Sequence, residues 1–121
     1  MRVKDAVGRF GEDVAAAHLE AAGLRIVERN WRCREGELDI VAREHSDLVF
    51  VEVKTRSSLA FGSPAEAVSR TKAARLRRLA LRWLQEHRDL DQFWAAVRFD
   101  VVSVVRHQTL GVQVQHLRGV L

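Results

Sequence analysis

Segment 36–56, with the sequence GELDIVAREHSDLVFVEVKTR, constrains the fold of this chain more than any other stretch. It contains two strand-like runs, 36–42 and 48–54, which are separated by a polar turn. Because side chains alternate between the two faces of a strand, Glu52 and Lys54 share a face of the second run with apolar residues. Both faces are apolar enough to be buried, and a buried charge is costly unless it is paired. The two charged residues therefore need each other, a metal or a ligand.

Asp39 supplies a second carboxylate beside this pair. If the two runs form a short antiparallel hairpin, Asp39 lies close to Glu52. Adjacent ionised carboxylates repel each other, and a cation that prefers oxygen ligands, such as Mg2+ or Mn2+, relieves that repulsion. Hydrolysis of a phosphodiester uses such a metal to activate water, and a lysine can hold the water or the developing charge. Asp39, Glu52 and Lys54 are therefore predicted to be catalytic residues for this chemistry.

Asp39 followed by Glu52-x-Lys54 also resembles the motif of the PD-(D/E)xK nuclease superfamily, which has the restriction-endonuclease-like fold. Further matches resemble the bacterial YraN-like family of that superfamily: Gly8-x-x-Gly11-Glu12, GELDIVA at 36–42, FVEVKTR at 50–56, Glu66-Ala67-Val68 followed by Lys72, and RFDVV at 98–102. Together they cover nearly the whole chain. The resemblance extends to archaeal Holliday junction resolvases. It implies a restriction-endonuclease-like α/β fold in a single domain, 1–121, with nuclease activity.

Glu12 is the third predicted metal ligand. It points away from the main apolar stripe of a first helix, among small residues that allow another backbone to approach closely. Resolvase-like proteins carry a glutamate on this helix that completes the metal site, so the resemblance implies that Glu12 joins Asp39 and Glu52. The alternative is that Glu12 is a solvated helix residue. Glu37 is a weaker accessory candidate.

The periodicity of apolar residues predicts the element order α-β-β-β-α-β-β. Helices are expected at 3–22 and 70–87, and strands at 24–33, 36–42, 48–54, 94–105 and 111–117. The sheet should be mixed and five-stranded, with the hairpin at its centre and the two long helices covering it.

Local signals refine these elements. The main core stripe of the first helix is predicted to consist of Val3, Val7, Phe10, Val14, Ala17 and Ala21. Imperfect alternation in 24–33 indicates a bulge or a sheet edge. Ser69 has the position of a helix N-cap, and the segment 63–66 has a capping-box pattern that predicts a short helical turn.

Basic side chains form the predicted nucleic-acid-binding surface. Arg75, Arg78 and Arg82 follow one face of the second long helix, and Lys72 lies near its N-terminus, where the helix dipole favours a phosphate. Arg56 lies at the start of the loop that follows the second run of the hairpin. Such contacts would position a polynucleotide without reading its bases. The alternative is a solvated basic surface.

Composition favours a polyanionic partner. The chain has 121 residues, a formal net charge of +4 and a pI of about 10.2, and its basic side chains are mostly arginine. Cys33 is the single cysteine, which excludes an internal disulfide. We recognise no signal peptide, no membrane-spanning stretch and no metal-ligand spacing among the histidines, and we expect a cytoplasmic protein.

These features predict a divalent-metal-dependent nuclease that acts on structured or branched DNA, as in DNA repair or recombination. Three alternatives stay open. The chain could be a non-catalytic nucleic-acid-binding module, a protein-interaction scaffold in which Glu52 and Lys54 form a buried ion pair, or a nuclease of RNA or single-stranded ends. A homodimer is inferred from the resolvase resemblance, because symmetric cleavage of two strands needs two sites.

Overall fold

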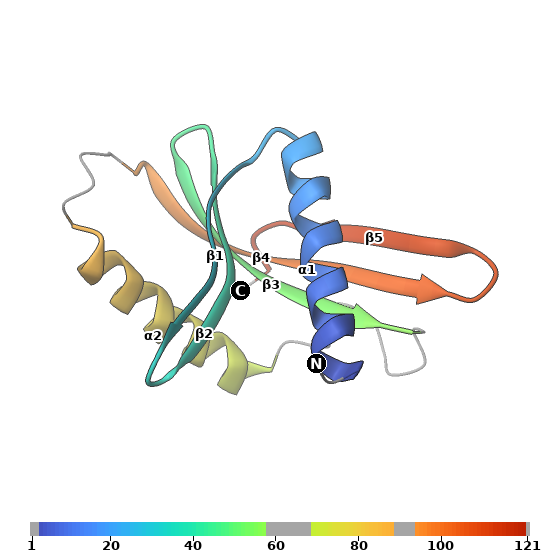
Figure 1. Ribbon diagram of the computed structural model, residues 1–121. Helices are drawn as coiled ribbons and strands as arrows, with labels where there is room; N and C mark the ends of the chain where they lie inside the picture. The colour runs from blue at the N-terminus through green and yellow to red at the C-terminus, as the bar shows by residue number, and fades with distance from the viewer. Residues whose placement is uncertain (1–2, 58–68, 89–93, 121) are drawn as a thin grey trace.

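A mixed five-stranded sheet with a helix on each face forms the framework of the computed structural model, which describes residues 3–57, 69–88 and 94–120 (Figure 1). The elements are α1 (Val3–Ala21), β1 (Arg25–Cys33), β2 (Gly36–Glu44), β3 (Asp47–Arg56), α2 (Arg70–Glu86), β4 (Ala96–His107) and β5 (Gly111–Leu117). This order and the α/β architecture confirm the prediction. The predicted helical turn at 63–66 lies outside the described residues.

The strands lie side by side in their sequence order, from β1 to β5. Every neighbouring pair is antiparallel except β3 and β4, which are parallel. A parallel pair requires a crossover, and α2 lies within that connection. The β2–β3 hairpin therefore occupies the middle of the sheet, as predicted. β1 is an edge strand with a register shift between Ile26 and Glu28, which confirms both features expected for this segment.

Each face of the sheet has its own apolar core. One core joins α1 to the sheet through residues that include Leu19, Ile40 and Val51. The other joins α2 to the opposite face through residues that include Phe50 and Trp83, whose rings meet edge to face at 5.8 Å. β3 is thus buried on both faces along its first half, which explains its continuous apolar sequence.

The predicted core stripe of α1 is wrong for three of its residues. Val7, Ala17 and Ala21 are exposed, whereas the helix buries Ala15, Ala16 and Leu19. The face that meets the sheet carries Gly11, Ala15 and Ala16, and these small residues let the helix backbone approach the sheet closely. Gly11 shows how close the approach is, because a Cβ atom at this position would overlap the hydroxyl of Thr55 on β3.

The predicted N-terminus of α2 is confirmed. Ser69 is its N-cap, and its side chain accepts a hydrogen bond from the Lys72 backbone N–H at 3.2 Å. The helix buries Ala73, Leu76, Leu79, Ala80 and Trp83 against the sheet. This cap fixes where α2 begins and so places Lys72 in its first turn.

The sheet divides at Asp39. Backbone pairing between β2 and β3 ends at Ile40 and Val51, whereas β1 and β2 stay paired as far as Cys33 and Gly36. The distal part of the β1–β2 hairpin therefore leaves β3 and extends over α2 (Figure 1). Leu38 accordingly packs in the α2 core, although Ile40, two residues later, packs in the α1 core. This break in alternation opens the position that the acidic residues occupy.

Candidate metal and phosphodiester site

Three carboxylates converge where β2 separates from β3. Glu12 comes from α1, and Glu37 and Asp39 come from β2. One oxygen of each lies within 4.8 Å of an oxygen of the others, and all three residues are half-buried. Oxygen ligands at this spacing suit a hard divalent cation. The structure thus brings together two of the three predicted metal ligands, together with the accessory candidate Glu37.

We define the acidic cluster as Glu12, Glu37 and Asp39. Within it, Asp39 has the most strongly raised pKa. Burial, and next the negative charge of Glu52, raise its pKa from 3.8 to about 7. One hydrogen bond opposes the shift, because the Val53 backbone N–H donates to Asp39 Oδ2 at 2.8 Å. The Asp39 carboxylate thus reaches across to β3 at a point where the strand ladder has already ended. A cation here would stabilise its charged form.

The neighbours of Glu12 on β1 act on its carboxyl. Burial raises its pKa, and the charge of Glu37 contributes in the same direction. The nearby side chain of Asn30 and the charge of Arg29 oppose the rise. The Glu12 carboxylate therefore lies in the acidic cluster, with Asn30 as a neighbour that was not predicted.

Glu52 lies beside the cluster but outside the set of three. Its Oε1 atom is 3.2 Å from Lys54 Nζ, and both side chains are about one-fifth exposed. The predicted hairpin register would have paired Asp39 directly with Glu52, but the ladder ends one pair earlier. The two carboxylates are still close enough for the charge of Glu52 to raise the pKa of Asp39.

Lys72 belongs to this site as well as to the helix surface. The positively charged Lys54 lies near its side chain and lowers the pKa of Lys72. Burial lowers the pKa of Lys54, but the nearby carboxylates of Glu52 and Asp39 act in the opposite direction, and its pKa is raised. Two amino groups from β3 and α2 therefore lie next to the carboxylates. The crossover between β3 and β4 creates this contact.

The predicted arginines occupy different environments. Arg75 and Arg78 are exposed on α2, and Arg75 lies beside Gly36 at the start of β2. Arg82 forms two ion pairs, with Nη1 2.8 Å from Glu35 Oε1 and Nε 3.5 Å from Glu86 Oε2. A phosphate would have to compete with these carboxylates, so Arg82 is a weaker candidate than the other two.

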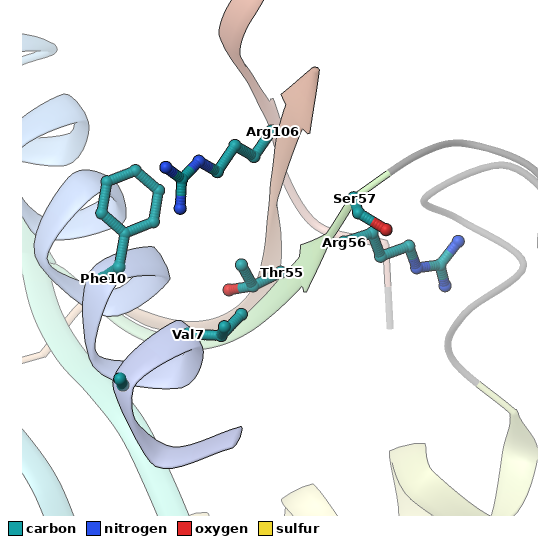
Figure 2. Close-up of a pocket in the computed structure, with 7 residues that line it drawn as sticks. Val7, Phe10, Thr55, Arg56, Ser57 and Arg106 are labelled. Carbon is teal, nitrogen blue, oxygen red and sulfur yellow. The ribbon is translucent and has the colours of Figure 1, made fainter. Parts of the chain in front are cut away.

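Arg56 lines a pocket of about 440 Å³ near the end of β3. The floor is formed by Phe10 and its neighbours on α1, and the Arg106 guanidinium carbon lies 5.4 Å from the centre of the Phe10 ring. Figure 2 shows Phe10 and Arg106 facing each other, whereas Arg56 extends away from both. Arg56 therefore lies on the rim of this pocket, near the end of the strand that carries Lys54.

Sequence reasoning missed Asn30 and underrated Glu37. A signal for Asn30 was present, because asparagine disfavours strands and adopts left-handed backbone conformations more readily than most residues. Trp31, the next residue along β1, packs partly against the α2 core. Glu37 alternates with Asp39 on one face of a regular strand, but the sequence does not show where that strand leaves the sheet.

Comparison with known proteins then fixes the family. Residues 11–104 match the model described as uncharacterised protein family UPF0102. The chain belongs to the UPF0102 family. The matched range contains the acidic cluster, Glu52, Lys54 and α2, and it confirms the YraN-like resemblance. No helix among the described residues is long and apolar enough to cross a membrane.

Relatives with the same family name match along almost their entire lengths. A UPF0102 protein of Beutenbergia cavernae is 63% identical over 120 residues, which cover 99% of both chains. A Frankia alni protein is 62% identical over 119 residues, covering 98% of this chain and 97% of its own. A Nocardia farcinica protein is 53% identical over 117 residues, covering 97% and 90% respectively.

Proposed function

We propose that this protein is a divalent-metal-dependent endonuclease that hydrolyses phosphodiester bonds in structured or branched DNA. The observation that carries the proposal is the convergence of Glu12, Glu37 and Asp39 at the division of the sheet. Half-buried carboxylates this close repel one another, and a bound cation would relieve the repulsion. A resident metal gives this costly arrangement a physical reason.

The donor chemistry fits Mg2+ or Mn2+. All the available ligands are carboxylate oxygens, which these hard cations prefer, and the cluster lacks the sulfur ligands that would favour softer metals. Glu12, Glu37 and Asp39 would hold the ion, with Glu52 close enough to join them. When bound, the ion would polarise the phosphoryl group and lower the pKa of a water molecule.

The two lysines would act on the substrate side of the carboxylates. Lys54 is held by Glu52 at 3.2 Å, which restricts its ammonium group to the edge of the cluster. From there it would orient the attacking water and stabilise the charge that develops on the phosphate. Lys72, in contact with Lys54, would bind a phosphate oxygen near the N-terminus of α2.

The exposed basic face of α2 would position the polynucleotide. Arg75 and Arg78 lie one and two helical turns beyond Lys72, so a phosphate backbone that reached the lysines could continue along them. The resulting affinity would depend strongly on salt and weakly on base sequence. We also propose that the protein acts as a homodimer, because cutting two strands symmetrically needs two copies of the site.

A second candidate function rests on the Glu52–Lys54 ion pair. The pair is only about one-fifth exposed and is complete without a ligand, as a structural ion pair in a protein-interaction scaffold would be. A scaffold would bind no Mn2+ and cleave no DNA. A non-catalytic nucleic-acid-binding module would bind DNA without cleaving it.

Cleavage of labelled four-way junction, duplex and single-stranded DNA in Mn2+ separates these functions. We expect the wild-type protein to cut the junction, and we expect Glu12→Gln and Lys54→Ala each to reduce the rate at least a hundredfold. Glu20→Gln is the matched control, because Glu20 is an exposed carboxylate on the same helix as Glu12. Full activity of both site variants in nuclease-free preparations would contradict the proposal.

A further inference from the structure

The backbone of Asn30 is unusual for a residue within a strand. Asn30 and His45 are the non-glycine residues with positive φ in the described parts of the chain, both at 55°. His45 lies in the two-residue turn between β2 and β3, where chain reversal accounts for such a value. Asn30 lies inside β1. Left-handed residues outside turns carry strain and tend to occur at functional sites.

Strand pairing does not require this conformation. Arg29 pairs with Ile40 and Trp31 pairs with Leu38, so the register is the same on both sides of Asn30. The bulge of β1 lies earlier, between Ile26 and Glu28. The position opposite Asn30 in this register is Asp39 of the acidic cluster. The local strain therefore occurs directly beside the candidate site.

The conformation changes where two neighbouring side chains point. On a regular strand, consecutive side chains point to opposite faces, so Arg29 and Asn30 could not both reach α1. In this structure they do. Arg29 Nη2 donates to Asp13 Oδ1, 2.6 Å away, and the Asn30 side chain lies near enough to Glu12 to lower the pKa of that carboxyl. Two adjacent strand residues, with a left-handed backbone at Asn30, therefore lie beside two adjacent helix residues.

We propose that Asn30 is a positioning residue that holds the Glu12 carboxylate in the acidic cluster, a role that rests on the proposed metal-dependent function. A carboxylate oxygen only accepts hydrogen bonds, so the amide NH2 group of Asn30 would be the donor. Such a bond would offset the repulsion between Glu12 and Glu37 and keep Glu12 directed towards Asp39. An arginine or lysine in this place would neutralise Glu12 and compete with a metal. A neutral amide orients the carboxylate and leaves its charge available.

Two substitutions at Asn30 separate positioning from backbone conformation. Asn30→Gly removes the amide but tolerates positive φ, whereas Asn30→Ala removes the amide and adds strain. We expect calorimetric titration at pH 8 to show about tenfold weaker Mn2+ binding for both variants, the size typical of lost outer-shell support. Thermal melting should differ, with Asn30→Ala less stable than Asn30→Gly.

His45→Gly is the matched control, because it makes the same change at the other residue with a φ of 55°. It should keep wild-type Mn2+ affinity. Wild-type affinity in Asn30→Gly would overturn the role of Asn30 while leaving the proposed function standing. Absence of Mn2+ binding in the wild-type protein would overturn both.

Discussion

Two aspartates of the same sheet, Asp100 and Asp39, have opposite charge environments. Asp100 on β4 is completely buried, and cationic or N–H groups surround it. Its Oδ1 atom accepts hydrogen bonds from Arg98 Nε and the Gly119 backbone N–H, both at 2.9 Å. Its Oδ2 atom lies 2.7 Å from His116 Nε2 and 3.0 Å from Arg98 Nη2. Each oxygen therefore has two partners.

Asp39 on β2 is surrounded mainly by like charge. The Val53 backbone N–H is its hydrogen-bond donor, and its pKa is raised to about 7 by burial and by the carboxylates of Glu52, Glu12 and Glu37. The comparison indicates a structural role for Asp100 and a functional role for Asp39. Asp100 joins β4 to the segment after β5 and has its charge balanced within the protein. Asp39 forms no ion pair among the described residues, although Lys54 is near, and a divalent cation would supply the compensation.

The largest expected effect tests the structural half of this comparison. Asp100→Ala should lower the free energy of unfolding by about 3–5 kcal/mol, because it leaves Arg98 and His116 without their buried partner. Urea denaturation followed by circular dichroism measures the change. Asp47→Ala is the control, since Asp47 contacts Arg98 only at 3.8 Å and is about one-third exposed. A loss below about 1 kcal/mol for Asp100→Ala would show that the balanced network is dispensable.

Asp39→Asn should raise the free energy of unfolding at pH 8, in contrast to the loss expected for Asp100→Ala. The pKa of Asp39 is about 7 in the folded protein and 3.8 in its ordinary state, so the folded protein holds the proton more tightly. Asp39 therefore lowers stability increasingly as pH rises from about 4 to about 7, and this loss persists at higher pH. Asparagine does not titrate and can still accept from Val53. The difference in free energy of unfolding between Asp39→Asn and wild type should be about 2–3 kcal/mol more favourable to the variant at pH 8 than at pH 4.

Urea denaturation of Asp39→Asn and wild type at both pH values, without divalent metal, measures this difference. A change in stability that is the same at pH 4 and pH 8 would mean that the charge of Asp39 is already balanced. The two aspartates would then not differ in the way we describe.

Gly11→Ala should disturb the surroundings of Asp39 by moving α1, which lies next to the acidic cluster. The added methyl group would overlap Thr55, so α1 must move away from β3 and carry Glu12 with it. We expect a loss of about 1–3 kcal/mol in stability together with weaker Mn2+ binding. Thr55→Ala in the same chain should restore part of both, as double-mutant coupling would reveal. Gly8→Ala is the control, because a Cβ atom there meets nothing within 4 Å.

The smallest expected effect concerns the basic helix face. Arg75→Gln combined with Arg78→Gln should weaken junction binding by about tenfold at low salt and reduce its salt dependence, because two phosphate contacts are lost. Arg82→Gln should change binding less, since Arg82 already contacts Glu35 and Glu86. Fluorescence anisotropy at several salt concentrations measures both. Equal effects of the double and single variants would contradict the assignment of the docking face to Arg75 and Arg78.

Much of the fold could be predicted from local sequence rules. Ser69 as the N-cap of α2, the bulged edge strand β1 and the order of elements each follow from short-range patterns, and the structure confirms them. The core stripe of α1 was misjudged because apolar residues occur on more than one face of this helix, so periodicity alone does not select the buried face. Val7 is exposed, and the face that meets the sheet carries Gly11, Ala15 and Ala16, which permit a close approach.

The candidate site was harder to predict because it depends on where the sheet stops being regular. Asp39 and Glu12 could be chosen from motif and spacing, but the separation of β2 from β3 decides that Glu37 joins them. The contact between Lys72 and Lys54 depends on how the crossover places α2. Asn30 depends on a single left-handed backbone angle. The first two features are set by residues that are far apart in the sequence, whereas the third had only a weak local signal in the choice of asparagine.

Calorimetric titration of Mn2+ at pH 8 into wild type, Asp39→Asn and Asp47→Asn tests the central claim most directly. We predict one bound ion in the wild type and in Asp47→Asn, and at least a hundredfold weaker binding in Asp39→Asn, which loses a direct ligand. Equal binding in all three proteins, or binding in none, would contradict the assignment of the acidic cluster as a cation site.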